Sequence, residues 1–200
     1  MSIRGWAALE PSRLPTVLAA FDGPWWVAGG VAIELFCGHW IRDHLDIDVE
    51  ILRGDAARLH AALPGWELHA AHRGRLSAWT PELPLHANSL WARPGPGAPW
   101  AVQFLLAAAT NTSNGAQRWA YRRDPRITYD LAQVGWIAHG ASVVSVQQPE
   151  LVLLFKSAAP RPQDDHDLSH AADLLTTHQR RWLRHAIRLA HPDSKWNRLL

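Results

Sequence analysis

The sequence has very little cysteine, lysine or methionine and no long apolar run. Cys37 is its single cysteine, so an internal disulfide is excluded and a cysteine-rich metal site is not expected. No apolar run reaches the roughly 18 residues that a membrane-spanning helix needs, so no membrane association is expected. The opening Met-Ser-Ile-Arg-Gly-Trp lacks the apolar core of a signal peptide. These absences predict a cytoplasmic protein.

A strong net charge is also lacking. The chain has 20 basic and 18 acidic residues and a formal net charge of +2 at pH 7. This balance gives no strong overall field for nucleic acid, so a nucleic-acid partner is not expected. One late stretch is basic; a solvated helix face explains it, and an acidic partner or RNA is the alternative. Its residues are His178, Arg180, Arg181, Arg184, His185 and Arg188.

The order of the predicted elements is that of a mixed α/β protein. Hydrophobic patterning predicts an α+β core over residues 1–145, with a mixed β-sheet flanked by helices, and a small helical region over residues 146–200. The small, polar segment 108–115 is expected to be a mobile loop. The expected strands are 25–28, 47–52, 66–70, 76–79, 89–92 and 100–106, and the expected helices are 12–22, 31–36, 55–64, 150–157, 164–177 and 178–190.

Two aspartates, Asp46 and Asp48, stand one residue apart where hydrophobic residues alternate with acids. This period-two pattern predicts a half-buried strand, on which alternate side chains point to the same face. Two carboxylates side by side are unfavourable unless a cation neutralises them. Mg²⁺ suits such a pair, because it takes one or two protein carboxylates and fills its other sites with substrate phosphates and water. The pair therefore predicts a nucleotide-handling site.

A solvated strand face is the alternative interpretation of the same acids. Glu50 continues the acidic face, and three acids in a row need either a cation or arginine partners. Arg42 and His44 lie just upstream and could supply such a partner. In that case the cluster would be a purely structural ion network.

Gly29 and Gly30 lie between a predicted strand and a predicted helix. Glycine there lets the backbone approach a phosphate closely, and the start of the helix offers free N–H groups and a favourable dipole. Many strand-to-helix turns need glycine for steric reasons alone, so the pair is a weak signal by itself. The nearby Asp46 and Asp48 strengthen it, because both elements could line one pocket.

Together these motifs resemble a known group of enzymes. Residues 26–33 read Trp-Val-Ala-Gly-Gly-Val-Ala-Ile, and residues 40–49 read Trp-Ile-Arg-Asp-His-Leu-Asp-Ile-Asp-Val. Both stretches are similar to the nucleotidyltransferases of the DNA polymerase beta superfamily, and within it to the aminoglycoside 2″-adenylyltransferase-like and lincosamide nucleotidyltransferase-like enzymes. Residues 148–156 and 161–167 resemble the helix and loop that follow the catalytic core there. The resemblance implies a nucleotidyltransferase fold with a helical C-terminal region.

The resemblance also implies a reaction. Asp46 and Asp48 would be the catalytic residues and would hold Mg²⁺ at the phosphates of a nucleoside triphosphate, with ATP as the expected substrate. Gly29 and Gly30 would cradle those phosphates. The hydroxyl of a small acceptor would attack the α-phosphate and release pyrophosphate. An aminoglycoside- or lincosamide-like antibiotic as acceptor, and hence antibiotic resistance, follows from the resemblance alone; a homodimer is compatible with it.

Two cations are candidates for nucleotide binding. Arg42 would add a positive charge near the phosphates. Lys156 lies on an otherwise apolar predicted helix and would either reach the phosphates or pair with Asp164 or Asp167. In the second case it would dock its helix to the following loop, and its role would be structural.

The sequence departs from the family pattern at two positions. Val31 follows the glycine pair where many members have Ser or Thr, although the antibiotic-modifying relatives accept a bulky residue there. Gln103 stands on the predicted strand 100–106 where a third acid is expected, and glutamine cannot accept a proton as a base. Either another side chain serves, or the acceptor needs no protein base, or catalysis has been lost. The candidate bases are Glu50, Glu67, Glu82 and His86.

Tryptophan is abundant, with 12 residues. Trp79, Trp91, Trp100 and Trp119 lie in the middle of the chain, where the family architecture would place the acceptor. Aromatic walls suit a sugar ring or a flat apolar acceptor. The alternative is that these side chains fill a small core.

The sequence thus predicts a Mg²⁺-dependent enzyme that places a nucleoside monophosphate on a small-molecule hydroxyl. One rival is a catalytically weak or inactive protein of the same fold that acts as an antitoxin or regulator through protein binding. A second rival is an enzyme that adenylylates a protein hydroxyl. The glycine and aspartate pairs favour the enzyme, whereas the missing third acid favours the inactive protein.

Overall fold

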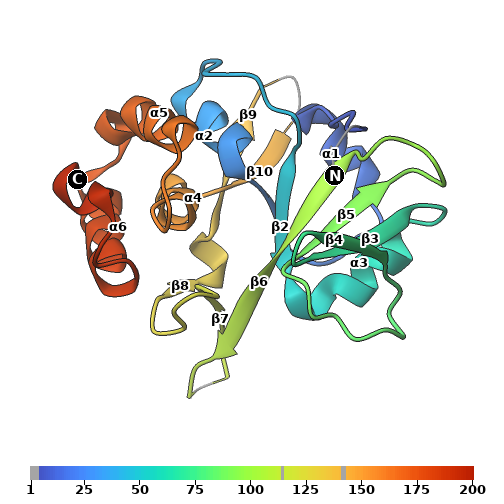
Figure 1. Cartoon of the computed structure of the whole chain (residues 1–200). Helices are drawn as coiled ribbons and strands as arrows, with labels where there is room; N and C mark the ends of the chain where they lie inside the picture. Colours follow the sequence, from blue (N-terminus) through green and yellow to red (C-terminus); the bar gives the residue numbers. More distant parts are fainter. Residues whose placement is uncertain (1–4, 114, 141–142) are drawn as a thin grey trace.

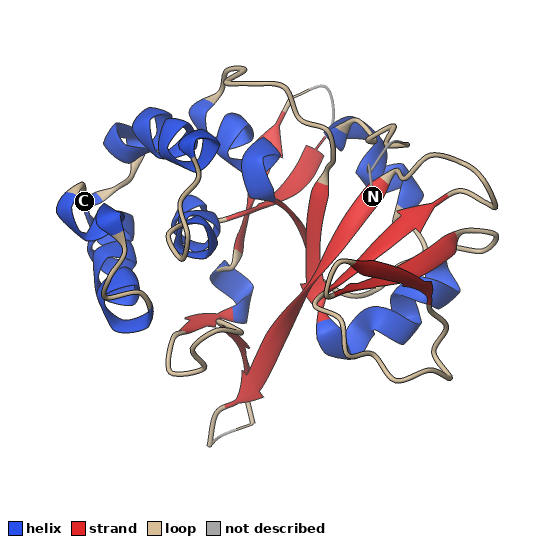
Figure 2. Cartoon of the chain, in the orientation of Figure 1, coloured by secondary structure: helices blue, strands red, loops and turns tan. Residues whose placement is uncertain are grey.

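The computed structural model describes residues 5–113, 115–140 and 143–200 and shows a mixed β-sheet flanked by helices (Figures 1 and 2). Its strands lie in the order β4-β3-β5-β6-β2-β1-β10-β9, and β7 and β8 extend the far end of β6. The strands are β1 (Trp25–Ala28), β2 (Asp48–Leu52), β3 (Glu67–His72), β4 (Arg75–Ala78), β5 (Ser89–Arg93), β6 (Val102–Asn111), β7 (Gln117–Ala120), β8 (Thr128–Asp130), β9 (Gly135–His139) and β10 (Val143–Gln147). This architecture confirms the expected α+β class.

Most of the α-helices that the structure describes lie together on one side of the molecule (Figure 1). In Figure 1, α4, α5 and α6 gather with α2 on one side of the molecule, while α3 lies beside the strands at the other end of the sheet. The α-helices are α1 (Leu14–Val17), α2 (Gly29–Cys37), α3 (Ala56–Ala62), α4 (Pro149–Lys156), α5 (Pro162–Ala171) and α6 (Thr177–Ala190). Short 3₁₀ helices cover Pro11–Arg13, Arg53–Asp55, Leu131–Gln133, Ala172–Leu174 and Lys195–Arg198.

β2 lies at the centre of the sheet, antiparallel to β1 and parallel to β6. Val49 and Ile51 are completely buried on one face, where a β-branched side chain packs well. Asp48 and Glu50 alternate with them and point to the opposite face. A central strand therefore carries acids into the interior of the protein.

The C-terminal helices are attached to the core mainly through α4. This helix packs against both α2 and α6, and its residues 149–154 are all buried. α6 buries one face through Leu183, Ala186 and Ile187, and Thr176 forms a capping box with Gln179 at its start. The predicted division at residue 145 stays a prediction; β10 ends at Gln147 and α4 begins at Pro149.

Several predicted elements differ from the observed ones. The predicted loop 108–115 is wrong for its first half, because β6 continues to Asn111 and residues 108–111 pair with β7; residue 114 lies outside the described residues. The predicted helix 12–22 is much shorter, since α1 ends at Val17. The strands β7, β9 and β10 were not predicted. Small residues such as Ala108 give only a weak strand pattern in the sequence. Whether they form a strand depends on pairing with segments that are more distant in the chain.

Among the helices of the described residues, none is long and apolar enough to cross a membrane, as the sequence predicts.

Gly135 at the start of β9 has no room for a side chain. A Cβ atom there would collide with the indole of Trp26, which is itself buried. Gly135→Ala should lower the free energy of unfolding by about 1–3 kcal/mol, because a packed ring must shift. Gly54→Ala is the matched control: no atom lies within 4 Å of its added Cβ, and a change below about 0.5 kcal/mol is expected in urea denaturation. Equal stability of both variants would contradict the packing at Gly135.

Candidate active site

Asp46 and Asp48 lie at the point where a loop enters the central strand. Asp48 is the first residue of β2, and the intervening Ile47 is buried. Burial and the neighbouring charge of Asp46 raise the pKa of Asp48 to about 7, although Lys156 and other nearby cations act in the opposite direction. The two carboxylates therefore remain incompletely compensated by the protein's own charges.

The glycine pair holds the start of α2 against these acids. Gly29 has φ +65°, a left-handed conformation that favours glycine, and an added Cβ would collide with the Oδ2 atom of Asp48. A Cβ at Gly30 would collide with Arg42 and His44. No side chain caps α2, so its first N–H groups stay available beside Asp48.

The loop that carries Asp46 is organised by Glu34 of α2. The Oε1 atom of Glu34 accepts hydrogen bonds of 2.9 Å from the backbone N–H groups of Ile41 and Arg42. The same oxygen lies 3.0 Å from Nε2 of His44. These contacts fix the segment between α2 and β2.

A chain of ion pairs joins this loop to the C-terminal helices. Nε of Arg42 lies 2.9 Å from Oδ1 of Asp167, and Nζ of Lys156 lies 2.8 Å from Oδ2 of the same carboxylate. Lys156 also contacts Asp164 at 2.9 Å, and Arg161 contacts Asp164 at 2.8 Å. Lys156 thus makes the helix-docking pairs of the structural interpretation, with both Asp164 and Asp167.

Burial of these carboxylates does not leave them neutral. Burial alone would raise the pKa of Asp167. Hydrogen bonds from Arg42 and Lys156 outweigh this effect and hold the pKa below its usual value. Asp167 therefore stays ionised and binds two cations at once. The network positions Arg42 and Lys156 beside the acid pair and neutralises most of their charge.

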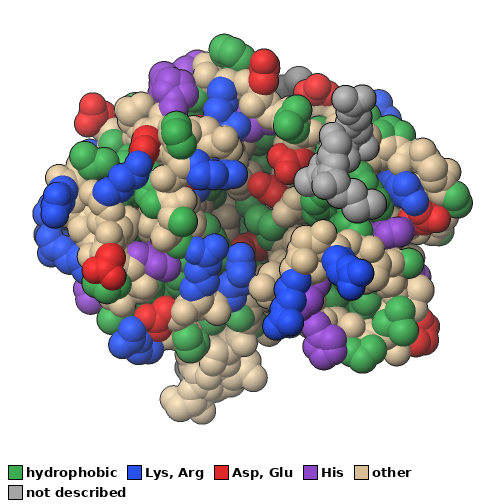
Figure 3. Space-filling view, in the orientation of Figure 1, with side chains coloured by type: hydrophobic (Ala, Val, Ile, Leu, Met, Phe, Trp, Pro, Cys, Tyr) green, Lys and Arg blue, Asp and Glu red, His purple; other side chains and the backbone are tan. Residues whose placement is uncertain are grey.

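A small cavity of about 270 Å³ opens beside Asp48, and we call it the small cavity. It lies between β2 and the C-terminal helices, and four cations surround it. In Figure 3, acidic side chains near the centre of the face are accompanied by lysine and arginine side chains. Its walls include Gly29, Asp48, Glu50, Leu105, Arg122, Arg123, Gln147, Phe155, Lys156, Arg161 and Asp164.

Glu50 is the one predicted base that the fold brings to Asp48. It lines the small cavity, and its Oε2 atom accepts hydrogen bonds from Nε1 of Trp119 at 2.9 Å and Nε2 of Gln147 at 2.5 Å. Burial raises the pKa of Glu50 to about 8, against the lowering effect of the Trp119 hydrogen bond. Its burial excludes the solvated strand face as an account of this residue.

The other predicted bases do not line the small cavity. Glu82 and His86 are exposed on the connection between β4 and β5. Glu67 lies on β3, and Nη2 of Arg93 contacts it at 2.6 Å. The structure therefore does not bring these three side chains together with Asp48.

No acid replaces the missing one on the neighbouring strands. Gln103 pairs in register with Asp48, and β6 and β1 contain neither Asp nor Glu. Leu105, which is in register with Glu50, lines the small cavity where a carboxylate could have stood. The departure noted in the sequence is thus a feature of the folded site.

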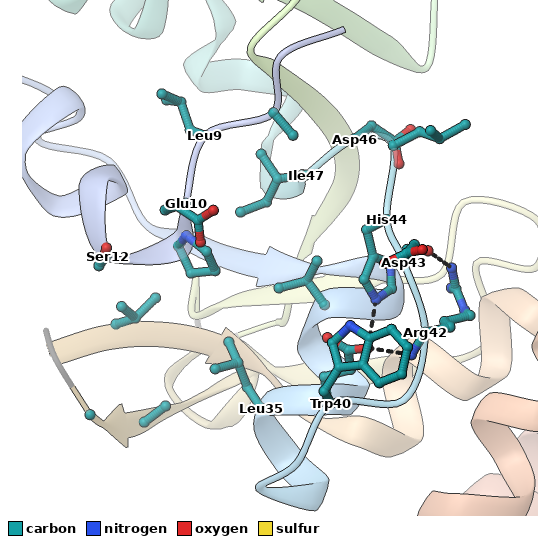
Figure 4. A pocket seen from close by; sticks show the side chains of 18 of the residues that line it. Leu9, Glu10, Ser12, Leu35, Trp40, Arg42, Asp43, His44, Asp46 and Ile47 are labelled. Carbon is teal, nitrogen blue, oxygen red and sulfur yellow. Dashed lines mark hydrogen bonds and ion pairs between the residues drawn. The ribbon is translucent and has the colours of Figure 1, made fainter.

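A second cavity, of about 1070 Å³, opens on the other side of the acid pair, and we call it the large cavity. Figure 4 shows Glu10 of the N-terminal segment on one side of it, and Arg42, His44 and Asp46 on the loop at the other. Asp46 lines the large cavity and Asp48 the small one, so the acid pair separates the two. The aromatic and acidic residues that line the large cavity include Trp6, Glu10, Glu34, Trp40, Asp43, Asp46 and Trp136.

The structure supports the core-filling interpretation for two of the four tryptophans, Trp79 and Trp119. Trp79 and Trp119 are buried in the core, and Trp91 and Trp100 pack against each other with ring centroids 5.7 Å apart. None of these four lines either cavity. The aromatic walls are instead formed by tryptophans from three separate segments of the chain, which no local pattern connects.

Sequence reasoning also missed Arg122 and Arg123 as site residues. They follow β7 in a turn and line the small cavity. The adjacent arginines are visible in the sequence, but nothing local relates them to β2.

Comparisons with known proteins agree with the motifs. The family model of aminoglycoside-2″-adenylyltransferase matches residues 12–75, which include the glycine pair and both aspartates. A comparison with curated protein sequences found no significant match.

Solved structures resemble nearly the whole chain at low sequence identity. The solution structure of the antibiotic-resistance factor ANT(2″)-Ia matches with a TM-score of 0.58 and 16% identity, over 91% of this chain and 92% of that one. The lincosamide antibiotic adenylyltransferase LnuA, bound to lincomycin, matches with a TM-score of 0.56 and 13% identity, over 84% and 99%. ANT(2″)-Ia in complex with adenylyl-2″-tobramycin gives 0.53 and 16%, over 90% and 97%. The chain therefore has the nucleotidyltransferase fold and resembles these adenylyltransferases, as its motifs predict.

Proposed function

We propose that the protein is a nucleotidyltransferase that moves a nucleoside monophosphate from a nucleoside triphosphate to the hydroxyl of a small acceptor. The observation that carries this proposal is the position of Asp46 and Asp48 between two cavities, with the start of α2 held against Asp48. One cavity is surrounded by cations and suits phosphates; the other has the size of a small-molecule site. The two reactants would meet at the carboxylates.

The acid pair fits a divalent cation. Within the described ranges, no three His, Cys, Asp or Glu side chains converge on a point that could hold a metal. Two carboxylates do suffice for Mg²⁺, which takes its remaining oxygens from phosphates and water. Burial and, after it, the charge of Asp46 raise the pKa of Asp48, so a cation would favour its ionised form. When bound, Mg²⁺ would neutralise charge on the transferring group and the leaving pyrophosphate.

The chain's own residues would orient the reactants. The first N–H groups of α2 have no side-chain cap, so they would bind a phosphate oxygen placed beside Asp48. An oxygen of the acceptor would bond to the α-phosphorus while the bond to the bridging oxygen breaks and pyrophosphate leaves. The hydroxyl proton passes to a base of the site or to water. Arg42 and Lys156, held by Asp167, add positive potential beside that centre.

ATP and a hydroxylated antibiotic are the reactants to test first. One similar solved structure is described as a lincosamide antibiotic adenylyltransferase, and another is a complex with adenylyl-2″-tobramycin. The large cavity here is lined by more acids than arginines and lysines, including Glu10, Asp43 and Asp46, so an acceptor bearing amino groups suits it. The missing third acid is compatible with the regulatory, non-catalytic alternative, whereas the comparisons do not favour it; the assay below decides between them.

The stability of the metal-free protein should depend on the charge of Asp48. Because its folded pKa is raised, its ionisation costs stability through a window from about pH 4 to about pH 7 and fully above it. Asp48→Asn should therefore stabilise the protein by about 1–3 kcal/mol at pH 8 in EDTA and by roughly a third of that at pH 5. Urea denaturation at both values measures this. Asp173→Asn, at an almost fully exposed side chain, is the control and should change neither.

A pH-independent effect of Asp48→Asn would contradict the electrostatic account of the pair. Added Mg²⁺ at pH 8 should raise the stability of the wild type, because a cation relieves the repulsion, and should leave Asp48→Asn unchanged.

Nucleotide transfer can be tested directly. Mg²⁺ with ATP, GTP, CTP or UTP should raise the melting temperature of the wild type, and labelled nucleotide should be transferred to one of a panel of aminoglycosides and lincosamides with release of pyrophosphate. Asp48→Asn should lower the turnover at least about a thousandfold, because metal-bound phosphates lose their anchor. Asp173→Asn should keep full activity. Failure of the wild type to bind any nucleoside triphosphate would refute the proposal.

A further inference from the structure

Among the residues that the structure describes, Arg122 and Arg123 are the two cations of the small cavity that form no ion pair, although the charge of Glu50 acts on Arg122. Lys156 and Arg161 also line the small cavity, but their charges are engaged by Asp164 and, for Lys156, Asp167.

The third arginine of the same segment behaves differently. Nη2 of Arg126 lies 2.6 Å from Oδ2 of Asp124, and Arg126 does not line the small cavity. In this segment of the described chain, the absence of an ion pair is therefore particular to the two arginines that face the cavity.

The turn that carries these arginines is firmly held. The N–H of Tyr121 donates to the carbonyl of Ile127 at 2.9 Å, and the N–H of Asp124 donates to the carbonyl of Tyr121 at 3.0 Å. Tyr121 is completely buried. The guanidinium of Arg122 lies 5.4 Å from the ring centroid of Phe155 on α4, close enough for a cation–π contact. The arginines are thus positioned before any ligand arrives.

Both side chains are exposed to solvent, and the positive charge of each acts on the other. Partial burial and the charge of Arg123 both lower the pKa of Arg122. Two adjacent cations at one cavity repel each other, and a polyanion would relieve that repulsion. Arginine presents planar donors that bind phosphate oxygens in pairs, so a phosphate chain is the ligand that these groups suit.

The small cavity joins the two features that a triphosphate needs. Asp48 and Gly29 form one part of its wall, and Arg122 and Arg123 form another. If the α-phosphate lies at Asp48 and α2, the rest of the chain extends toward the arginines.

We propose that Arg122 and Arg123 bind the β- and γ-phosphates of the nucleotide, and hence the pyrophosphate that leaves. This inference rests on the proposed function, and it assigns to the turn after β7 the recognition of the phosphate chain. Lys156 and Arg161 would then mainly position their carboxylate partners, while the unpaired arginines distinguish a triphosphate from a monophosphate.

The test compares binding of ATP, ADP and AMP by isothermal titration calorimetry in Mg²⁺. The wild type should bind ATP more tightly than AMP. Arg122→Gln and Arg123→Gln should each weaken ATP binding about tenfold, and the double variant about a hundredfold, with AMP affinity unchanged. Arg126→Gln removes the same charge from the same segment and should bind all three nucleotides as the wild type does.

Two further measurements guard against a variant that merely folds poorly. Arg122→Lys and Arg123→Lys keep the charge but lose the planar fork, so ATP affinity should fall between those of the wild type and the glutamine variants. Inorganic tripolyphosphate should displace ATP from the wild type, which shows that the phosphate chain itself is bound. Melting temperatures of all variants identify those that are folded.

The outcomes separate this inference from the function on which it rests. If the wild type binds ATP and the folded glutamine or lysine variants bind it equally well, or lose ATP and AMP affinity in equal measure, the role of the arginines is refuted and the nucleotidyltransferase proposal stands. If the wild type binds no triphosphate, both are refuted. A selective loss of ATP affinity, absent in Arg126→Gln, supports the assignment.

Discussion

The close approach of the first turn of α2 to the acids of β2 is the constraint on which the site depends. Gly29 can lie there only because it has no Cβ, and this places helix N–H groups beside Asp48. The same approach helps to hold Asp48 in surroundings where burial and the charge of Asp46 make its negative charge costly. A bound cation would neutralise the acids, and a phosphate would accept hydrogen bonds from the helix N–H groups. In the proposed reaction, the metal ion and the nucleotide would therefore relieve the unfavourable charge at this site.

The cations around this centre divide into two groups with different physical roles. Arg42, Lys156 and Arg161 are bound to Asp164 and Asp167, and these pairs join the loop before β2 to α4 and α5. Because paired charges are largely compensated, their main effect is on geometry. The unpaired arginines after β7 retain their attraction for an anion. The fold thus separates the cations whose ion pairs hold the helices in place from the arginines that can bind an anion.

The parts predicted correctly from the sequence are those with local signals. The strand at 25–28, the glycine turn and the acidic strand lie within one short stretch, and period-two alternation with glycine is enough to identify them. The small cavity could not be predicted, because its walls come from β2, the turn after β7 and the C-terminal helices. For the same reason Glu50 could not be separated from Glu82 until the fold showed that one is buried beside Asp48 and the other exposed.

The two cavities also explain how one pair of acids could serve a displacement reaction. In-line transfer requires the attacking and leaving oxygens to lie on opposite sides of the phosphorus. A phosphate chain that extends from Asp48 toward Arg122 leaves the Asp46 side open, and the large cavity lies on that side. In the proposed reaction, an acceptor in the large cavity would approach from the side opposite the leaving group. Selectivity for the acceptor would then depend on the N-terminal segment and Trp40, which line the large cavity but do not touch the small one.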